Sequence, residues 1–250
     1  MTIALYYSLI GMTFLIAGMV KGTIGLGLPT VAMALLGVWL PPSQAAALLL
    51  IPSLVTNLWQ LFNGPAWVCL LRRLWPMLAA VCLGTVFGPN LMAGGRAGWA
   101  SLALGLLLML YALLGLANLR WRVNQQSEAW LGPVIGLATG AITGATGVFV
   151  IPAVPYLTAL SLDRDELIQA LGLSFTLSTL ALAAGLARHH LIDAQMVGLS
   201  LLAVAPALAG MLFGTWLRGK ISAALFRRAL FVGLLGLGLE ITWRHLPMVW

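Results

Sequence analysis

The chain has 250 residues, of which 61% are apolar and only 8% are charged, and its formal net charge is +7. Soluble domains carry about 25% charged residues, so this composition excludes a soluble protein and predicts an all-α protein that crosses a membrane several times. A spanning helix needs about 20 apolar residues, which leaves room for at most about nine or ten crossings and no soluble domain. The 13 basic residues are scattered at the ends of apolar segments, as in cytoplasmic loops, so we expect the lipid bilayer and no nucleic acid as a partner.

Taken in chain order, the first half contains an interrupted apolar region followed by three full-length segments. The first apolar run, Ile3 to Val20, has neither a basic flank nor a cleavage site, so we expect a retained helix rather than a signal peptide. Lys21 and a glycine-rich break, Gly22 to Pro29, follow it, and a short apolar piece then reaches Pro41. The full-length segments are expected at about 43–62, 74–93 and 97–118.

A polar stretch separates this half from a second one with the same order of segments. We expect a first repeat at residues 1–119, a central cytoplasmic loop at 120–129 and a second repeat at 130–250. In the second repeat an apolar run at 130–143 meets a break at Gly144 to Gly147. After a short piece that ends near Ser161, segments are expected at about 165–186, 194–216 and 222–243.

An internal duplication explains this restart. Two nearly equal shifts superpose an ordered series of residues, whereas isolated glycine matches would carry little meaning. A shift of 122 residues aligns Gly18, Gly22 and Gly25 with Gly140, Gly144 and Gly147, Leu40 with Leu162, and Thr56-Asn57 with Ser178-Thr179. A shift of 126 aligns Gly84-Thr-Val-Phe87-Gly88 with Gly210-Met-Leu-Phe213-Gly214.

The basic residues favour two inverted repeats, each a broken or re-entrant helix pair followed by three transmembrane helices. With this arrangement most bases fall on one face, which the positive-inside rule assigns to the cytoplasm, and both termini lie outside. The cytoplasmic face then holds Arg72, Arg73, Arg120, Arg122, Arg164, Arg218 and Lys220, and the other face holds Arg96, Arg188 and Arg244. Residues 130–161 give only about 48 Å of helix, whereas two crossings need about 60 Å, so the second pair is expected to be re-entrant.

Interrupted helices at matching positions of inverted repeats indicate a secondary transporter. A broken helix exposes backbone N–H groups and a positive dipole end, and both attract an anion. We therefore expect a small anionic substrate at the two breaks. The residues concerned are Gly22, Thr23, Gly25 and Gly27 in the first half and Thr143, Gly144, Thr146 and Gly147 in the second. For Gly84/Gly88 and Gly210/Gly214 the Gly-x-x-x-Gly spacing indicates close helix packing instead.

Lys21 is the one charged residue within a break, and the shift of 122 aligns it with Thr143. A lysine inside a membrane is costly and usually faces a cavity or a partner. Lys21 therefore either holds the anion as a point charge or extends its ammonium group to the cytoplasmic surface. We include it among the substrate-binding residues.

A polar face with helical spacing follows the first break. It consists of Ser53, Thr56, Asn57 and Gln60. In the matching segment of the second half, Ser174 and Ser178 lie one turn apart. These groups either donate hydrogen bonds to an oxyanion or bond neighbouring helices to each other. Their matching positions favour the substrate, and we assign that role to Thr56, Asn57, Ser174 and Ser178.

The sequence offers little for catalysis. His189 and His190 supply too few ligands for a metal site, and there is no nucleophile–base pair, phosphate loop or redox cysteine motif. We expect no enzyme, no metal and no cofactor. An anion channel, an importer of another small anion and a structural subunit are the alternatives to an exporter, and the coupling ion and a homodimeric state stay open.

Two passages resemble the sulfite exporter TauE/SafE family. They are Ala17-Gly-Met-Val-Lys-Gly-Thr-Ile-Gly-Leu-Gly-Leu-Pro29 and Gly136-Leu-Ala-Thr-Gly-Ala-Ile-Thr-Gly-Ala-Thr-Gly-Val-Phe-Val-Ile-Pro152. The similarity extends through Ala170-Leu-Gly-Leu-Ser-Phe-Thr-Leu-Ser178 and covers essentially the whole chain. It implies a multi-pass permease of the bacterial inner membrane that exports sulfite, sulfoacetate or a related organosulfonate by alternating access. The family's usual run of consecutive glycines is interrupted here by Leu26, Leu28, Val148 and Phe149.

Overall fold

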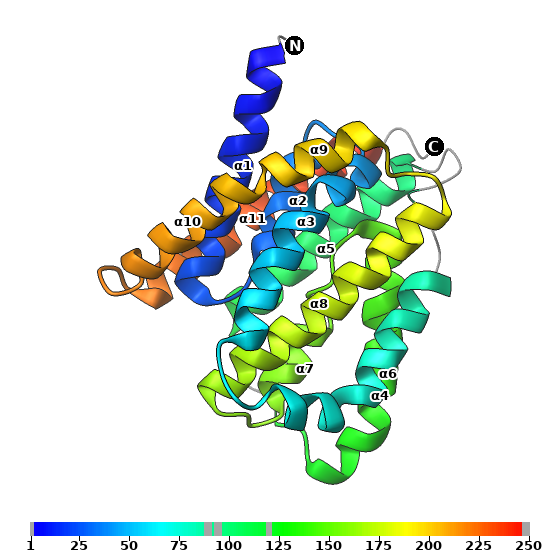
Figure 1. The fold of residues 1–250 in the computed structure, drawn as a ribbon, viewed down its shortest axis with the longest axis vertical. Helices are drawn as coiled ribbons and strands as arrows, with labels where there is room; N and C mark the ends of the chain where they lie inside the picture. Colours follow the sequence, from blue (N-terminus) through cyan, green and yellow to red (C-terminus); the bar gives the residue numbers. More distant parts are fainter. Residues whose placement is uncertain (1–2, 88–91, 93–96, 119–121, 247–250) are drawn as a thin grey trace.

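The computed structural model describes residues 3–87, 92, 97–118 and 122–246, and all regular structure in these ranges is helical (Figure 1). The helices are α1 (Ile3–Ile24), α2 (Leu28–Leu36), α3 (Pro42–Phe62), α4 (Trp67–Phe87), α5 (Ala97–Ala117), α6 (Gln125–Thr146), α7 (Ala153–Ala159), α8 (Arg164–Arg188), α9 (Ala194–Leu202), α10 (Val204–Leu217) and α11 (Ala223–His245). The all-helical fold predicted from the composition is confirmed.

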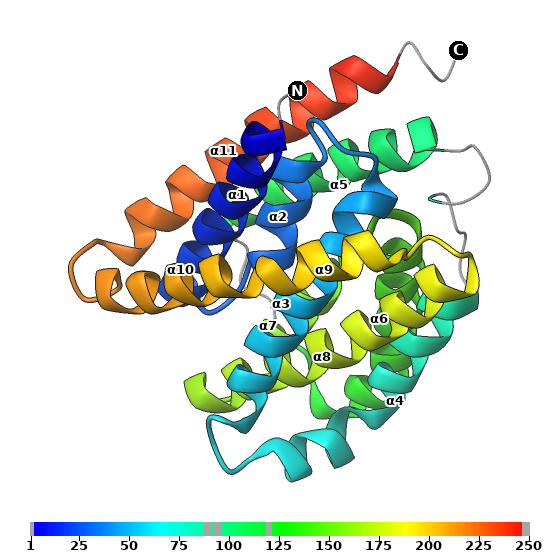
Figure 2. The same cartoon turned by 45° about the horizontal axis from the view of Figure 1, so that its top comes forward.

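Seven helical stretches of the described ranges are long and apolar enough to cross a membrane. They are α1, α3, α4, α5, α6, α8 and the combined stretch of α9 and α10. Ala203 joins these last two helices with φ −69° and ψ −13°, and Figure 2 shows them as one nearly continuous path. Large apolar side chains such as Leu106 and Val232 are more than half exposed, as lipid contact permits and water does not. The chain is a multi-pass membrane protein.

Helices of the first half pack mainly against helices of the second half. α1 lies along α10 and α6 along α4, while α3 packs on α8 and α5 on α11. The interrupted helix of each half, α1 or α6, therefore packs on a long helix of the opposite half, α10 or α4. This exchange of partners supports the predicted duplication.

Glycines bring α1 and α10 into backbone contact. A Cβ atom added at Gly22 would lie 2.1 Å from the carbonyl oxygen of Met211, and one added at Gly214 would lie 2.1 Å from that of Met19. Real Cβ atoms do not approach so closely, so only glycine permits this helix spacing. Gly22, which the sequence placed at the substrate, thus faces α10.

Glycines also bring α6 and α4 into backbone contact. A Cβ atom at Gly140 would lie 2.3 Å from the carbonyl oxygen of Val81, and one at Gly84 would lie 2.6 Å from that of Leu137. The packing role predicted for Gly84, Gly210 and Gly214 is confirmed, and Gly88 lies outside the described residues.

Both interruptions depend on glycines in the left-handed region of φ. The angle φ is +83° at Gly25 and +105° at Gly27, between α1 and α2, and +75° at Gly147, between α6 and α7. A residue with a Cβ atom pays about 1–2 kcal/mol for such angles, whereas glycine adopts them freely. The two predicted breaks are confirmed, although α1 and α6 continue through Ile24 and Thr146 before they end.

The short helices after the breaks lie inside the bundle. α2 has nine residues and α7 has seven, and most side chains of both are buried. At 1.5 Å per residue these helices are about 14 Å and 11 Å long, too short to cross a bilayer. Their length and burial support the re-entrant arrangement expected from the sequence.

Two helix boundaries differ from the sequence prediction. α4 covers Trp67–Phe87 rather than residues 74–93, and α6 begins at Gln125, inside the loop predicted at residues 120–129. The charges in these stretches pair with each other, since Arg73 of α4 forms an ion pair with Glu128 in the first turn of α6. Residues 125–129 of the predicted loop therefore belong to α6, whereas residues 122–124 are non-helical as predicted.

Candidate functional site

Lys21 lies inside the protein, in the last turn of α1. Its side chain is only 2% exposed. The ammonium nitrogen donates hydrogen bonds to Thr56 Oγ1, at 3.1 Å, and to Asn57 Oδ1, both on α3. The ion pairs within the described residues are Arg73–Glu128 and Arg244–Glu240, so no carboxylate there neutralises this lysine. Of the two alternatives left by the sequence, the structure places Lys21 in the interior rather than at the surface.

The polar groups around Lys21 join α3 to α8. The Asn57 amide nitrogen donates to Ser53 Oγ, at 3.1 Å, and lies 3.5 Å from Thr179 Oγ1. The Thr56 hydroxyl donates to the carbonyl oxygen of Pro52, at 2.8 Å, which leaves its lone pairs for the lysine. Asn57 and Thr179 are the residues that the shift of 122 aligns, so matching positions of the two halves meet here.

Gln60 connects the same face of α3 to the first break. Its amide nitrogen donates to the backbone carbonyl oxygen of Gly25. Its own carbonyl oxygen, Oε1, is buried and has no hydrogen-bond partner among the described residues. A buried polar atom without a partner costs about 1–3 kcal/mol, so a bound water, ion or other molecule would stabilise this site.

Three hydroxyl groups share this property. They belong to Thr30 in the first turn of α2 and to Ser174 and Ser178 on α8, all with 0% exposure. Two of them, Ser174 and Ser178, were selected from the sequence. Lys21, Thr56 and Asn57 are also at most 2% exposed. The polar centre, which we define as Lys21, Ser53, Thr56, Asn57, Gln60 and Thr179, is therefore closed to solvent in this structure.

Thr23 lies on the opposite side of α1 from this centre. Its hydroxyl contacts the carbonyl oxygens of Met19, at 2.8 Å, and of Gly214 on α10, at 3.2 Å. Arg218, after α10, donates from Nε to the carbonyl oxygen of Thr23, at 2.8 Å, and from Nη2 to that of Gly22. Burial, and to a lesser degree the charge of Arg164, lowers the pKa of Arg218. Gly22 and Thr23 therefore fasten α1 to α10.

The second break contributes backbone and apolar surface rather than free polar groups. Thr143 donates to the carbonyl oxygen of Thr139, at 2.7 Å, and Thr146 donates to that of Ile142, at 2.8 Å, so both hydroxyls are bonded within α6. A Cβ atom at Gly144 would lie 2.8 Å from the carbonyl oxygen of Thr85 on α4. The residues that follow, 148–151, are buried and apolar.

The structure thus gathers only part of the set chosen from the sequence. Lys21 contacts Thr56 and Asn57, and Gly25 accepts a hydrogen bond from Gln60 on the same face of α3. Gln60, Ser53 and Thr179 were not selected although the first two lie on the predicted polar face, and Thr179 could have been found because it aligns with Asn57. Nothing in the local sequence distinguishes Thr30 from other threonines.

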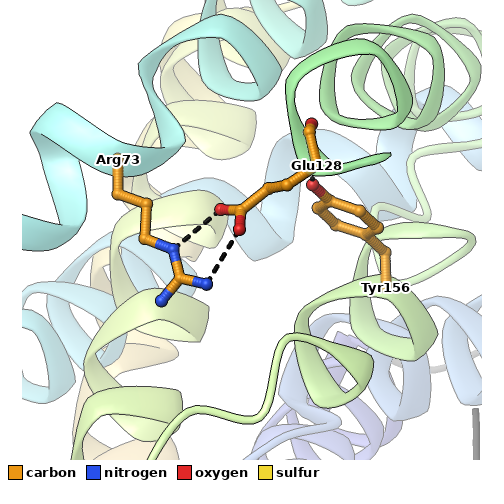
Figure 3. Close-up of polar contacts among 3 residues, drawn as sticks. All are labelled: Arg73, Glu128 and Tyr156. Carbon is orange, nitrogen blue, oxygen red and sulfur yellow. Dashed lines mark hydrogen bonds and ion pairs between the residues drawn. The ribbon is translucent and has the colours of Figure 1, made fainter. Parts of the chain in front are cut away.

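A second polar feature, absent from the sequence prediction, lies where α4, α6 and α7 meet. Arg73 binds Glu128 through two hydrogen bonds of 2.8 Å, and the Tyr156 hydroxyl lies 3.4 Å from the backbone oxygen of Glu128 (Figure 3). These residues line a cavity of about 340 Å³ together with Leu74, Pro76, Met77, Ala129 and Gly132. The positive charge of Arg73 is already neutralised by Glu128, so this cavity attracts an anion less than Lys21 does.

Comparison with known proteins places the chain in a family. The model of a family described as sulfite exporter TauE/SafE matches residues 10–241, nearly the whole chain. No curated protein and no solved structure matches. Within the described residues no group of three or more His, Cys, Asp or Glu side chains could hold a metal ion. With its membrane-spanning helices and this match, the chain belongs to the sulfite exporter TauE/SafE family of membrane permeases.

Proposed function

We propose that this permease binds a small sulfur-containing anion, such as sulfite, sulfoacetate or a related organosulfonate, beside Lys21 at the first helix break. The observation that carries this proposal is a buried lysine without a carboxylate partner among the described residues. A buried charge without a counter-charge costs several kcal/mol. An anionic substrate would supply the counter-charge and remove that cost.

The lysine and other buried polar groups of the bundle are suited to oxygen atoms of a sulfonate. A lysine ammonium has three N–H donors, of which two are directed at Thr56 and Asn57. The hydroxyls of Thr30, Ser174 and Ser178 are buried and unpartnered, so each can donate a hydrogen bond without losing one. Thr30 also lies in the first turn of α2, where the helix dipole favours negative charge.

We further propose that transport proceeds by alternating access between two inverted repeats. The exchange of helix partners between the halves and the contact of Asn57 with its aligned residue Thr179 support this symmetry. In Figure 2 the start of α1 and the end of α11 lie toward the same end of the molecule, as inverted halves require. A polar centre closed on both sides fits an intermediate of such a cycle, in which the site opens to one side at a time.

The proposed direction is outward across a bacterial inner membrane, as the family's description suggests. Purified protein in liposomes tests this function through the uptake of radiolabelled sulfite over a range of concentrations. We expect saturable uptake that excess sulfoacetate inhibits and excess acetate does not. Uptake that rises linearly with concentration would instead indicate an anion channel, and equal inhibition by acetate would remove the assignment to sulfur anions.

A further inference from the structure

The side-chain carbonyl oxygen of Gln60 is the one unpartnered group of the polar centre that can only accept a hydrogen bond. The side chain is 7% exposed, and Oε1 has no donor among the described residues. The unpartnered hydroxyls of Thr30, Ser174 and Ser178 can turn to donate or to accept, whereas an amide oxygen cannot. Anionic oxygens, which also only accept, therefore leave Gln60 Oε1 unsatisfied.

The orientation of the Gln60 amide is fixed by the first break. Its nitrogen donates to the carbonyl oxygen of Gly25, which itself lies in the left-handed turn that ends α1. Rotating the amide by 180° would bring two oxygen atoms together and lose that bond. The amide oxygen is therefore held in place, and the amide NH2 group cannot take its position as a donor.

This acceptor lies one helical turn from the groups that hold the charge. Gln60 follows Asn57 by three residues on α3, a rise of about 4.5 Å. On α1 the residues that these groups contact are also one turn apart. Gly25 follows Lys21 by four residues and donates its N–H to the Lys21 carbonyl oxygen, at 2.8 Å. A rise of about 4.5 Å is short enough for one small ligand to reach both groups.

We propose that the transported anion carries its own O–H or N–H donor, which binds Gln60 Oε1 while the anionic group binds at Lys21. This assignment rests on the proposed function and narrows its substrates. The class comprises hydrogensulfite and short sulfonates that bear a hydroxyl or amino group. Fully deprotonated anions and simple alkanesulfonates fit the charge and leave Gln60 without a partner.

The test compares two nearly isosteric ligands of the purified wild-type protein by isothermal titration calorimetry. They are 2-hydroxyethanesulfonate and propane-1-sulfonate, which differ by a hydroxyl in place of a methyl group. A ligand without the donor leaves a buried acceptor unpaired, which corresponds to at least about a tenfold weaker Kd. We expect the hydroxy compound to bind at least tenfold more tightly, although a methyl group is the more favourable one to bury.

Equal affinities, or a preference for propane-1-sulfonate, would overturn this inference and leave the proposed function intact, since both ligands would still bind. Binding of neither sulfonate would overturn this inference, and if sulfite also failed to bind, the proposed function would fall with it. The variant Gln60→Met, which keeps the length of the side chain, is expected to abolish the preference. Ser178→Ala serves as the matched control, because it should weaken both ligands by a similar factor and keep their ratio.

Discussion

The break between α1 and α2 brings a lysine ammonium against α3, whereas the break between α6 and α7 brings Phe149 against Phe175 of α8, with ring centroids 5.3 Å apart. Both breaks use left-handed glycines and both follow a helix that packs through glycines on a partner from the other half. Their side chains differ. Under the shift of 122 residues, Lys21 aligns with Thr143 and Gln60 with Leu182.

This difference separates what the fold needs from what the site needs. The backbone needs small residues at the turns and at the helix crossings, and both halves have them. The polar groups differ in kind between the halves, since the lysine charge and the fixed acceptor of Gln60 lie in the first half, whereas the unpartnered groups of the second half are the hydroxyls of Ser174 and Ser178. A nearly symmetric scaffold can therefore hold an asymmetric substrate with one charged end.

The largest effect is expected from Lys21→Met, which keeps the aliphatic chain and removes the charge. Losing one partner of a buried charge pair costs about 3–5 kcal/mol, which is at least about 100-fold in the Kd for sulfite. Lys220→Gln is the matched control, because Lys220 is exposed and lies over the Trp216 ring, at 3.8 Å from its centroid. Titration calorimetry of the two purified variants measures the effect, and an unchanged Kd for Lys21→Met would remove the lysine from the site.

Alanine in place of a glycine at the α1–α10 contact or at the α4–α6 contact should destabilise the protein by a similar amount. We expect Gly22→Ala and Gly140→Ala each to lower the free energy of unfolding by about 1–3 kcal/mol, since the added methyl group meets a backbone carbonyl. Gly198→Ala is the control, because a Cβ atom there has open space around it. Thermal unfolding in detergent measures this, and a variant at Gly22 as stable as the control would disprove its packing role.

A matched pair of threonine variants compares the breaks themselves. Thr56→Val removes an acceptor of the Lys21 ammonium, which corresponds to about a tenfold weaker Kd for sulfite. Thr143→Val removes a hydroxyl whose hydrogen bonds go to the backbone oxygens of Thr139 and Val148 and not to Lys21. The Kd for sulfite should therefore change less than twofold. The same calorimetric measurement decides, and a larger loss at Thr143 than at Thr56 would reverse the assignment of the charged end to the first half.

The smallest effect concerns the ion pair between α4 and α6. The side chain of Arg73 is 37% exposed, so a double-mutant cycle with Arg73→Gln and Glu128→Gln should give a coupling of at most about 1 kcal/mol in unfolding free energy. This coupling should fall as salt is added, because salt screens partly exposed charges. A coupling of several kcal/mol, insensitive to salt, would show that this pair is a main fastening of the fold.

Much of the fold could be predicted because it depends on properties that a sequence displays directly. Runs of about 20 apolar residues predict spanning helices, and the repeated glycines at Gly25 and Gly147 predict the breaks. The start of α4 at Trp67 could not be predicted, since Arg72 and Arg73 suggested a loop, and the partner of Arg73, Glu128, lies 55 residues further along the chain.

The site was predicted less completely because its residues depend on which helix lies opposite. Gly22 and Lys21 are neighbours in sequence, yet one faces α10 and the other faces α3. Thr23 and Thr56 are equally polar, and only the packing of α1 decides that Thr56 contacts the lysine. Gln60 matters for the site because its Oε1 atom has no hydrogen-bond partner. No sequence pattern reveals whether a buried atom has a partner.

The central claim is that an anion binds beside Lys21, and locating a bound anion tests it most directly. Selenite, the selenium analogue of sulfite, can be placed in a crystal of the protein by its anomalous scattering. We expect a selenium peak whose oxygen atoms lie within hydrogen-bonding distance of Lys21 Nζ and near Thr30, Ser174 or Ser178. A peak at Arg73 in the cavity between α4 and α6, or none within the helix bundle, would contradict the account.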